Sequence, residues 1–287
     1  MHILFDLGKT KLRVAGSRDF ESFIEPKIFD TPKDYDATIA LIAKTAQEIC
    51  AGGELEMVVG GIGGPLDKDK NGLVERVNTP GWEGRPFPGW GGRPFRDDLS
   101  LALHSKVHIQ NDSALVGLGE ACYGAGRDSD IVAYITVSTG LGGARIVKKK
   151  IDQNSLGFEP GWQVLSLEDE GCYASDSLTG QSVETATGKK PYETTDPIFW
   201  DKKAHILAHF LNNVIVMWSP DVVVIGGSMM KEIGIPIPAT EKYLRHILRI
   251  FDEIPPIKKA ELQDIGGLWG ALQYLKDIKH DSLSYVR

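Results

Sequence analysis

Two glycine-rich turns in the 287-residue sequence have the composition of anion-binding loops. GKT at 8 to 10 follows the apolar run HILFDL, and STGLGG at 138 to 143 follows DIVAYITV. A Gly-rich turn between antiparallel strands points consecutive backbone N–H groups into one concavity that binds anions. Each turn alone is also explained as a hairpin with glycine at positive φ, but the pair predicts a grip on the phosphate chain of one nucleotide. Neither matches G-x-x-x-x-G-K-[ST], and G-x-G-x-x-G does not follow the first strand.

Carboxylates at two predicted strand ends could supply the remaining chemistry. Phosphoryl transfer needs in-line positioning, charge neutralisation and a carboxylate that accepts a proton from the acceptor hydroxyl. Asp6 could hold Mg²⁺ directly or through waters, or it could cap the turn. Asn111 and Asp112 follow KVHIQ and precede a helix, so an amide and a carboxylate project from one edge of the sheet. Helix capping is the competing explanation for this pair.

The elements that must position these residues follow from hydrophobic periodicity. Strands are predicted for HILFDL, KLRVAGS, MVVGGIGGPL, KVHIQ, DIVAYITV, ARIV, DVVVIGG and PPIKKAEL. Helices are predicted for DYDATIALIAKTAQEIC with a stop at Gly52-Gly53, SALVGLGEACYGAG, about Trp200 to Trp218, LRHILRIFDEI and GGLWGALQYLKDI. The continuous valines of DVVVIGG are typical of a buried parallel strand. Strands and helices mix throughout, so the fold class is α/β.

Composition excludes several classes of protein. The length and a hydrophobic content of 42% allow one large or two medium domains. The net charge is 32 minus 39, or −7, and apart from Lys148 to Lys150 the basic residues are scattered, which argues against nucleic-acid binding. No segment approaches the roughly 20 apolar residues of a membrane span. Three distant cysteines form no disulfide framework or C-x-x-C pair, so we expect a cytoplasmic protein.

A tandem copy, PGWEGRPF at 80 to 87 and PGWGGRPF at 88 to 95, interrupts this pattern. Its eight-residue period is shorter than that of solenoid repeats, so it is one duplicated loop. Trp82 and Trp90 could rim a binding site. They could equally be packed aromatics in a Pro/Gly turn.

The ordered motifs resemble the ROK family of repressors, uncharacterised reading frames and sugar kinases. Those motifs are DLGKTK, GGIGGPLDKDKNGL, NTPGWEG, NDSALVGLGEACYGAG, STGLGGARIV, VVVIGGS and GGLWGAL. The resemblance covers nearly the whole chain. It implies two ribonuclease H-like domains of the actin, hexokinase and Hsp70 superfamily, with ATP and sugar meeting in the cleft between them. We expect these domains at 1–110, with the helix of about 271–287 packing back on it, and at 111–270.

The resemblance also implies roles for residues at matching positions. Asp112 matches the catalytic base, with Mg²⁺ near Asp6. Matches to sugar-contacting positions are Gly64, Asn78, Asn111 and Glu159. Matches to ATP-binding positions are Gly8, Thr10 and Lys11 in the first phosphate loop, Thr139, Gly140 and Gly143 in the second, and Gly226 and Gly227 on the adenosine side.

The sequence departs from the family in the zinc loop. The family pattern is E-x-G-H followed by a cysteine-rich loop that ends in a sugar-binding glutamate. Here Glu159 and Gly161 keep their places, but Trp162 replaces the histidine, and Cys172 alone cannot close a tetrahedral Zn²⁺ site. The glutamate position is Ser175 or Asp176. We therefore predict no structural zinc and a sugar that stacks on Trp162, although Trp162 could instead fill the volume of the missing loop.

The function predicted from this resemblance is ATP- and Mg²⁺-dependent phosphorylation of a monosaccharide hydroxyl by a glucokinase-like enzyme. A non-catalytic sugar sensor of the same fold is the first alternative. A polyphosphate-dependent sugar kinase is the second, although that kind of protein would be expected to have an extended basic track. The resemblance further implies a homodimer, with neither nucleic acid nor membrane as a partner.

Overall fold

The computed structural model describes residues 1–78, 87–166 and 172–284. The chain forms two compact units. The N-terminal unit comprises Met1–Cys122, Gln153–Gly157 and Asp264–Arg287, and the C-terminal unit comprises Tyr123–Asp152 and Phe158–Gln263. The expected division after residue 110 thus falls inside the N-terminal unit, at the end of a strand.

A five-stranded sheet forms the centre of the N-terminal unit, in the order β3-β2-β1-β4-β5. The strands are β1 (His2–Leu7), β2 (Lys11–Ser17), β3 (Lys27–Asp30), β4 (Met57–Ile62) and β5 (Lys106–Asn111). The first three are antiparallel neighbours, whereas β4 and β5 run parallel to β1. The carboxyl ends of β1, β4 and β5 therefore meet at one edge, where Asp6, Gly61 and Asn111 lie.

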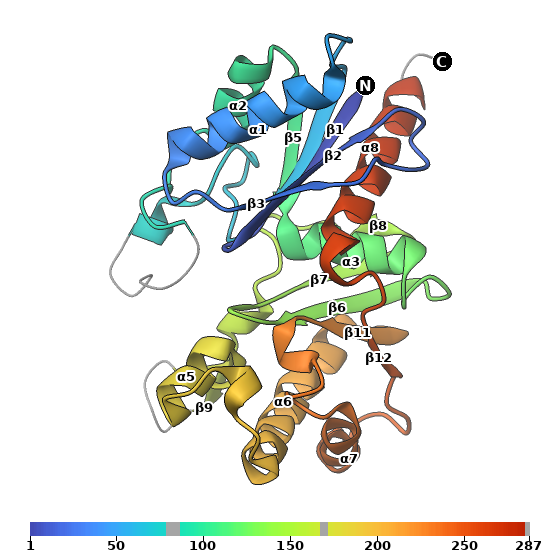
Figure 1. The fold of residues 1–287 in the computed structure, drawn as a ribbon. Helices are drawn as coiled ribbons and strands as arrows, with labels where there is room; N and C mark the ends of the chain where they lie inside the picture. The colour runs from blue at the N-terminus through green and yellow to red at the C-terminus, as the bar shows by residue number, and fades with distance from the viewer. Residues whose placement is uncertain (79–86, 167–171, 285–287) are drawn as a thin grey trace. The chain divides into compact units, whose positions relative to one another are not determined.

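Helices flank this sheet (Figure 1). They are α1 (Tyr35–Cys50), α2 (Phe95–Leu103), α3 (Asp112–Tyr123) and α8 (Gly266–Ser284), with the short helix η1 at Glu75–Asn78. The predicted first helix is confirmed: Asp34 caps its N-terminus by accepting from the Ala37 N–H, and Ala51 ends it in the left-handed conformation. On the face of the sheet opposite α1, α8 packs against α3 so closely that a Cβ on Gly270 would lie 1.7 Å from the Leu115 carbonyl oxygen.

The C-terminal unit contains a second five-stranded sheet, in the order β12-β11-β6-β7-β8. Its strands are β6 (Ile131–Val137), β7 (Leu141–Val147), β8 (Lys150–Ile151), β11 (Val222–Gly226) and β12 (Ile257–Lys259), and β9 (Val164–Ser166) pairs with β10 (Cys172–Tyr173) in a separate ribbon. The valine-rich β11 lies between β6 and β12 and is parallel to both, as predicted. All five of its residues are buried.

Helices of the C-terminal unit bury one face of this sheet in a single apolar core. The helices are α4 (Ala174–Leu178), α5 (Gly180–Thr187), α6 (Pro197–Trp218) and α7 (Ile237–Ile247), and the short helices are η2 (Pro160–Trp162), η3 (Pro191–Glu193) and η4 (Ser228–Met230). Phe210 and Leu211 of α6, Leu244 of α7 and Ile135 of β6 are fully buried in it. Residues 201–215 of α6 alternate buried and exposed with the helical period.

The helix predicted for residues 244–254 is misplaced. The structure has α7 at Ile237–Ile247, with Pro238 in its first turn and an extended Leu248 at its C-terminus. Proline in the first turn costs no hydrogen bond, so residues 236–238 provide a start signal that the apolar pattern missed. No helix in the described part of the chain is long and apolar enough to cross a membrane.

Candidate active site

The first glycine-rich turn joins β1 to β2. The Gly8 N–H donates to the Lys11 carbonyl at 3.0 Å, and the Thr31 hydroxyl donates to the Gly8 carbonyl at 2.7 Å. Thr10 is exposed at the tip. The ammonium of Lys11 lies 2.7 Å from the carboxylate of Asp30 on β3, so this lysine already has a surface partner.

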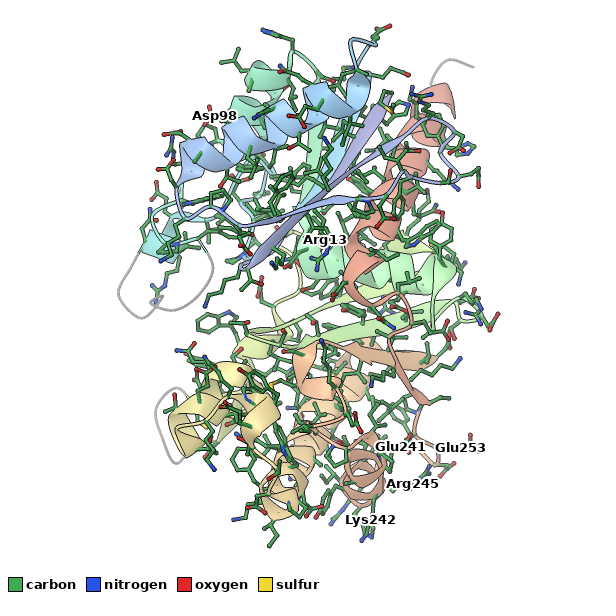
Figure 2. All side chains as sticks on the ribbon, viewed as in Figure 1. Arg13, Asp98, Glu241, Lys242, Arg245 and Glu253 are labelled. Atoms are coloured by element: carbon green, nitrogen blue, oxygen red, sulfur yellow. The ribbon has the colours of Figure 1, made fainter. Side chains whose placement is uncertain are left out.

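Asp6 is enclosed by charged neighbours at the end of β1. Arg13 lies opposite it on β2, and Figure 2 labels its side chain. Nη1 of Arg13 is 3.6 Å from Asp6 Oδ2, and Nη2 is 3.7 Å from Oδ2 of Asp264. A Cβ on Gly267 would come within 2.8 Å of the Asp6 carboxyl carbon, so only glycine lets α8 begin this close. Burial and the negative charge of Asp112 raise the pKa of Asp6 to about 7, and Arg13 opposes the rise.

Asp112 stands where β5 ends and α3 begins. Its Oδ1 accepts from the backbone N–H of Ser113 at 2.6 Å and from the Ser113 hydroxyl at 3.2 Å. Its Oδ2 has no hydrogen-bond partner among the described residues, and the Cβ of a residue replacing Gly63 would lie 3.0 Å from it. Burial raises the pKa of the Asp112 carboxyl, and the bonds from Ser113 lower it. This carboxylate can accept a proton at one oxygen while the other is held.

Asn111 links the helix start to the glycine-rich segment after β4. Its Oδ1 accepts from the Ala114 N–H at 3.2 Å, which is the capping role, and its Nδ2 donates to the Gly64 carbonyl at 3.0 Å. Gly64 has a φ of 115°, a conformation that favours glycine. Asn111 therefore caps α3 and also holds the backbone of Gly64, and its role in sugar binding stays a prediction.

Asn78 has a structural partner of its own. It ends η1, and its amide pairs reciprocally with the backbone of Gly91, donating to the carbonyl and accepting from the N–H at 3.0 Å each. The neighbouring Trp90 is 3% exposed and stacks among Tyr35, Phe87 and Phe95. Trp90 is thus a packed aromatic, whereas Trp82 lies outside the described residues.

The second glycine-rich turn, in the C-terminal unit, joins β6 to β7. The Ser138 N–H donates to the Gly140 carbonyl at 2.8 Å, and both Thr139 and Gly140 are exposed. The Gly180 N–H at the start of α5 donates to the Ser138 carbonyl at 2.8 Å. The Ser138 hydroxyl lies 2.9 Å from the hydroxyl of Ser228. Two further segments of the chain therefore fix this turn.

Gly226 and Gly227 both lie very close to neighbouring segments of the C-terminal unit. Gly227 has a φ of 97°, and a Cβ there would lie 2.2 Å from the Val137 carbonyl oxygen. A Cβ on Gly226 would lie 3.0 Å from Ala260. A Cβ on Gly143 would lie 2.6 Å from the Tyr134 carbonyl oxygen, so glycine at this position allows β7 to pack closely against β6. By contrast, nothing lies within 4 Å of a Cβ on Gly140.

The segment that replaces the zinc loop is built around η2. Glu159 precedes this turn and accepts the Trp162 N–H through its backbone carbonyl at 3.1 Å. Trp162 is partly exposed and meets the ring of Tyr173 edge-on, with centroids 5.1 Å apart. Gly161 is buried, and a Cβ on it would lie 2.1 Å from the Leu141 carbonyl oxygen, so η2 packs directly against β7.

Neither candidate for the sugar-binding glutamate position is free of structural contacts. Ser175 is 5% exposed, and its hydroxyl faces Gly161. Asp176 is exposed and accepts from the Tyr173 N–H at 3.3 Å, as a helix cap. In the described residues no group of three or more His, Cys, Asp or Glu side chains is arranged to hold a metal ion. The lack of zinc stays a prediction.

The Asp6 environment fits Mg²⁺. Carboxylate oxygens are hard donors, and Mg²⁺ is usually held by one or two carboxylates with waters and substrate phosphates. The negative charges of Asp112 and Asp264 raise the pKa of Asp6, and among the described residues Arg13 is the one cation that lowers it. An added cation would relieve this excess of negative charge.

Several of these contacts could not be predicted from sequence patterns. Arg13 faces Asp6 only because of the β1–β2 register, and Gly267 comes from the far end of the chain. Gly180 and Ser228 reach the second turn through tertiary packing. The one available signal was Thr179-Gly180 before a helical run, since threonine is a favoured N-cap.

Comparison with known proteins identifies the family of the chain. Residues 3–278 match the model of the ROK family. A glucokinase of Thermotoga maritima is 25% identical over 313 residues, covering 95% of this chain and 96% of that protein. An N-acetyl-D-glucosamine kinase of Escherichia coli is 25% identical over 311 residues, covering 94% and 98%.

Solved structures show the same fold. A ROK hexokinase from Thermus thermophilus has a TM-score of 0.78 at 25% identity, covering 96% of this chain and 99% of that one. A ROK family glucokinase from Streptomyces griseus, solved with glucose and AMPPNP, has a TM-score of 0.75 at 22% identity, covering 95% and 98%. The α/β architecture with two mixed sheets is that of these hexokinase-like proteins, and the chain belongs to the ROK family.

Proposed function

We propose that the protein is a sugar kinase that transfers the γ-phosphate of ATP to a hydroxyl of a monosaccharide. The observation that carries this proposal is Asp112, a partly buried carboxylate at a strand–helix junction, with one oxygen held by Ser113 and the other without a partner among the described residues. Family membership and similarity to named sugar kinases support it.

In this proposal, different residues of the chain supply the base, the sugar contacts, the phosphate contacts and the metal site. Asp112 accepts the proton of the attacking hydroxyl, and Asn111 with Gly64 positions the sugar beside it. The turns at 8–10 and 138–140 bind phosphate oxygens through backbone N–H groups and the hydroxyls of their threonines. Asp6 would hold Mg²⁺ directly or through waters, and the ion would neutralise charge on the phosphates.

The segment at residues 159–176, which departs from the family's zinc-loop pattern, should affect which sugar is bound. Trp162 offers an aromatic face where a histidine is usual in the family, and Asp176 is engaged by the Tyr173 N–H. We therefore propose that stacking contributes more, and hydrogen bonding less, to sugar recognition at this point. The substrate is then a hexose or amino sugar whose discrimination relies mainly on Asn111 and its surroundings.

The decisive experiment is a panel of monosaccharides with Mg-ATP, read by ADP release, on wild-type protein and Asp112→Asn. General-base catalysis contributes about 10² to 10⁴-fold, so the variant should lose at least about a hundredfold in kcat while sugar binding measured by calorimetry remains. Asp98→Asn is a matched control, because Asp98 accepts from the Tyr35 hydroxyl within the same unit. Sugar binding without turnover in the wild type would indicate a sensor instead.

A further inference from the structure

Lys203, in the second turn of α6, is a buried cation that the mechanism above does not use. Its residue exposure is 9%. Burial lowers the pKa of its ammonium, and no carboxylate in the described part of the chain contributes to that pKa. A buried charge without an opposite charge is costly, so stability alone does not explain a lysine at this position.

The ammonium of Lys203 joins two short helices. Its Nζ donates to the carbonyl of Ser177 in the last turn of α4 at 2.5 Å. It also lies 3.4 Å from the hydroxyl of Ser182 in the first turn of α5. The ring centroid of Phe199, one turn earlier in α6, is 5.2 Å from Nζ and limits its movement. Lys203 therefore fixes the α4–α5 junction.

Hydrogen bonds continue from this junction to the second glycine-rich turn. The Ser182 hydroxyl donates to the Thr179 carbonyl at 2.7 Å, and the Thr179 hydroxyl donates to the Ser175 carbonyl at 2.8 Å. The next residue, Gly180, donates its N–H to the Ser138 carbonyl at 2.8 Å. A displacement of the junction would thus move a backbone group that holds the turn.

The positive charge of Lys203 also lies close to the N-terminus of α5. A helix N-terminus carries partial positive charge, so a cation beneath the first turn of α5 is unfavourable in the absence of an anion. The same two positive charges favour a phosphate close to the N-terminus. We therefore expect this charge to cost stability in the free protein and to favour an anion near this helix N-terminus.

We propose that Lys203 is a positioning residue for the phosphate donor: it holds the α4–α5 junction so that Gly180 fixes the turn at 138–140, and it adds positive charge behind that turn. This inference rests on the proposed kinase function. It assigns Lys203 no contact with substrate.

The test compares Lys203→Met with Lys203→Arg in the full chain. Methionine keeps the unbranched shape without the charge or the donor. Loss of one such bond is worth about 1.4 kcal/mol, so the KM for ATP should rise about tenfold, while the KM for sugar is unchanged. The melting temperature of the methionine variant should be unchanged or higher, because a desolvated cation has been removed. Arginine should restore the KM to within about threefold of wild type.

Lys258→Met is the matched control, since Lys258 also donates to a backbone carbonyl in this unit, that of Ala125 at 3.2 Å, but from an exposed site. Its KM for ATP should equal that of wild type. An unchanged KM in Lys203→Met, or a loss of folding in that variant, overturns the inference. Wild-type protein that neither binds nor turns over Mg-ATP overturns the proposed function itself, and calorimetry on wild type separates the two results.

Discussion

The hydroxyl of Ser113 should affect the pH at which the reaction rate falls on the acid side of the pH–rate profile (the acid limb), because it hydrogen-bonds to Asp112. In the native site it donates to Asp112 Oδ1 at 3.2 Å, alongside the backbone N–H at 2.6 Å. Both bonds favour the ionised carboxylate and lower its pKa, whereas burial raises it. Ser113→Ala removes only the hydroxyl bond, so the pKa of Asp112 must rise further and a higher pH is needed to generate the base.

The size of this shift follows from the strength of the bond. At 3.2 Å the interaction is long for a charge-assisted hydrogen bond, so we take about 1 kcal/mol. One pKa unit corresponds to 1.36 kcal/mol, which gives a shift of about 0.7 unit to higher pH. At pH values well above the limb the rate of the variant should be close to that of wild type, because Asp112 is then ionised in both proteins.

The assay is initial rate against pH at saturating Mg-ATP and sugar, with ADP release as the readout. Ser100→Ala is the control, because the Ser100 hydroxyl donates to the Ser105 carbonyl at 2.6 Å within the same unit. Its limb should coincide with that of wild type. A limb that stays in place or moves to lower pH in Ser113→Ala would refute Asp112 as the base whose ionisation the limb reports.

Four further substitutions test the fold by urea unfolding, the first three at one pH and the fourth as a function of pH. Gly227→Ala should lower the free energy of unfolding by about 3 kcal/mol or more, because its φ is positive and its Cβ would strike the Val137 carbonyl. Gly140→Ala should change it by less than about 0.5 kcal/mol, since the site is open. Trp90→Ala should cost about 3 to 5 kcal/mol, and a smaller loss would contradict its core role. His2 is buried and its pKa is lowered by burial, so wild-type stability should fall as pH drops below its unfolded value of 6.5, and His2→Gln should lessen that fall.

Local sequence patterns predicted much of the fold. The β1–β2 hairpin, α1 with its Asp34 cap, and the parallel β11 were all predictable because their signals lie within a few residues of one another. The position of α7 was wrong for the complementary reason. Apolar residues at 248–254 continue the helical pattern, but proline at 238 had already placed the helix start seven residues earlier than predicted.

The sequence by itself determined which residue types stand at strand ends, namely the carboxylates at 6 and 112 and the glycine-rich turns that follow β1 and β6. Tertiary structure decided their environments. Arg13 and Gly267 reach Asp6 from another strand and from the end of the chain, and Lys203 reaches the α4–α5 junction from α6. The reason is physical: composition and spacing act through bonds near in sequence, whereas burial, charge proximity and pKa depend on groups that only folding brings together.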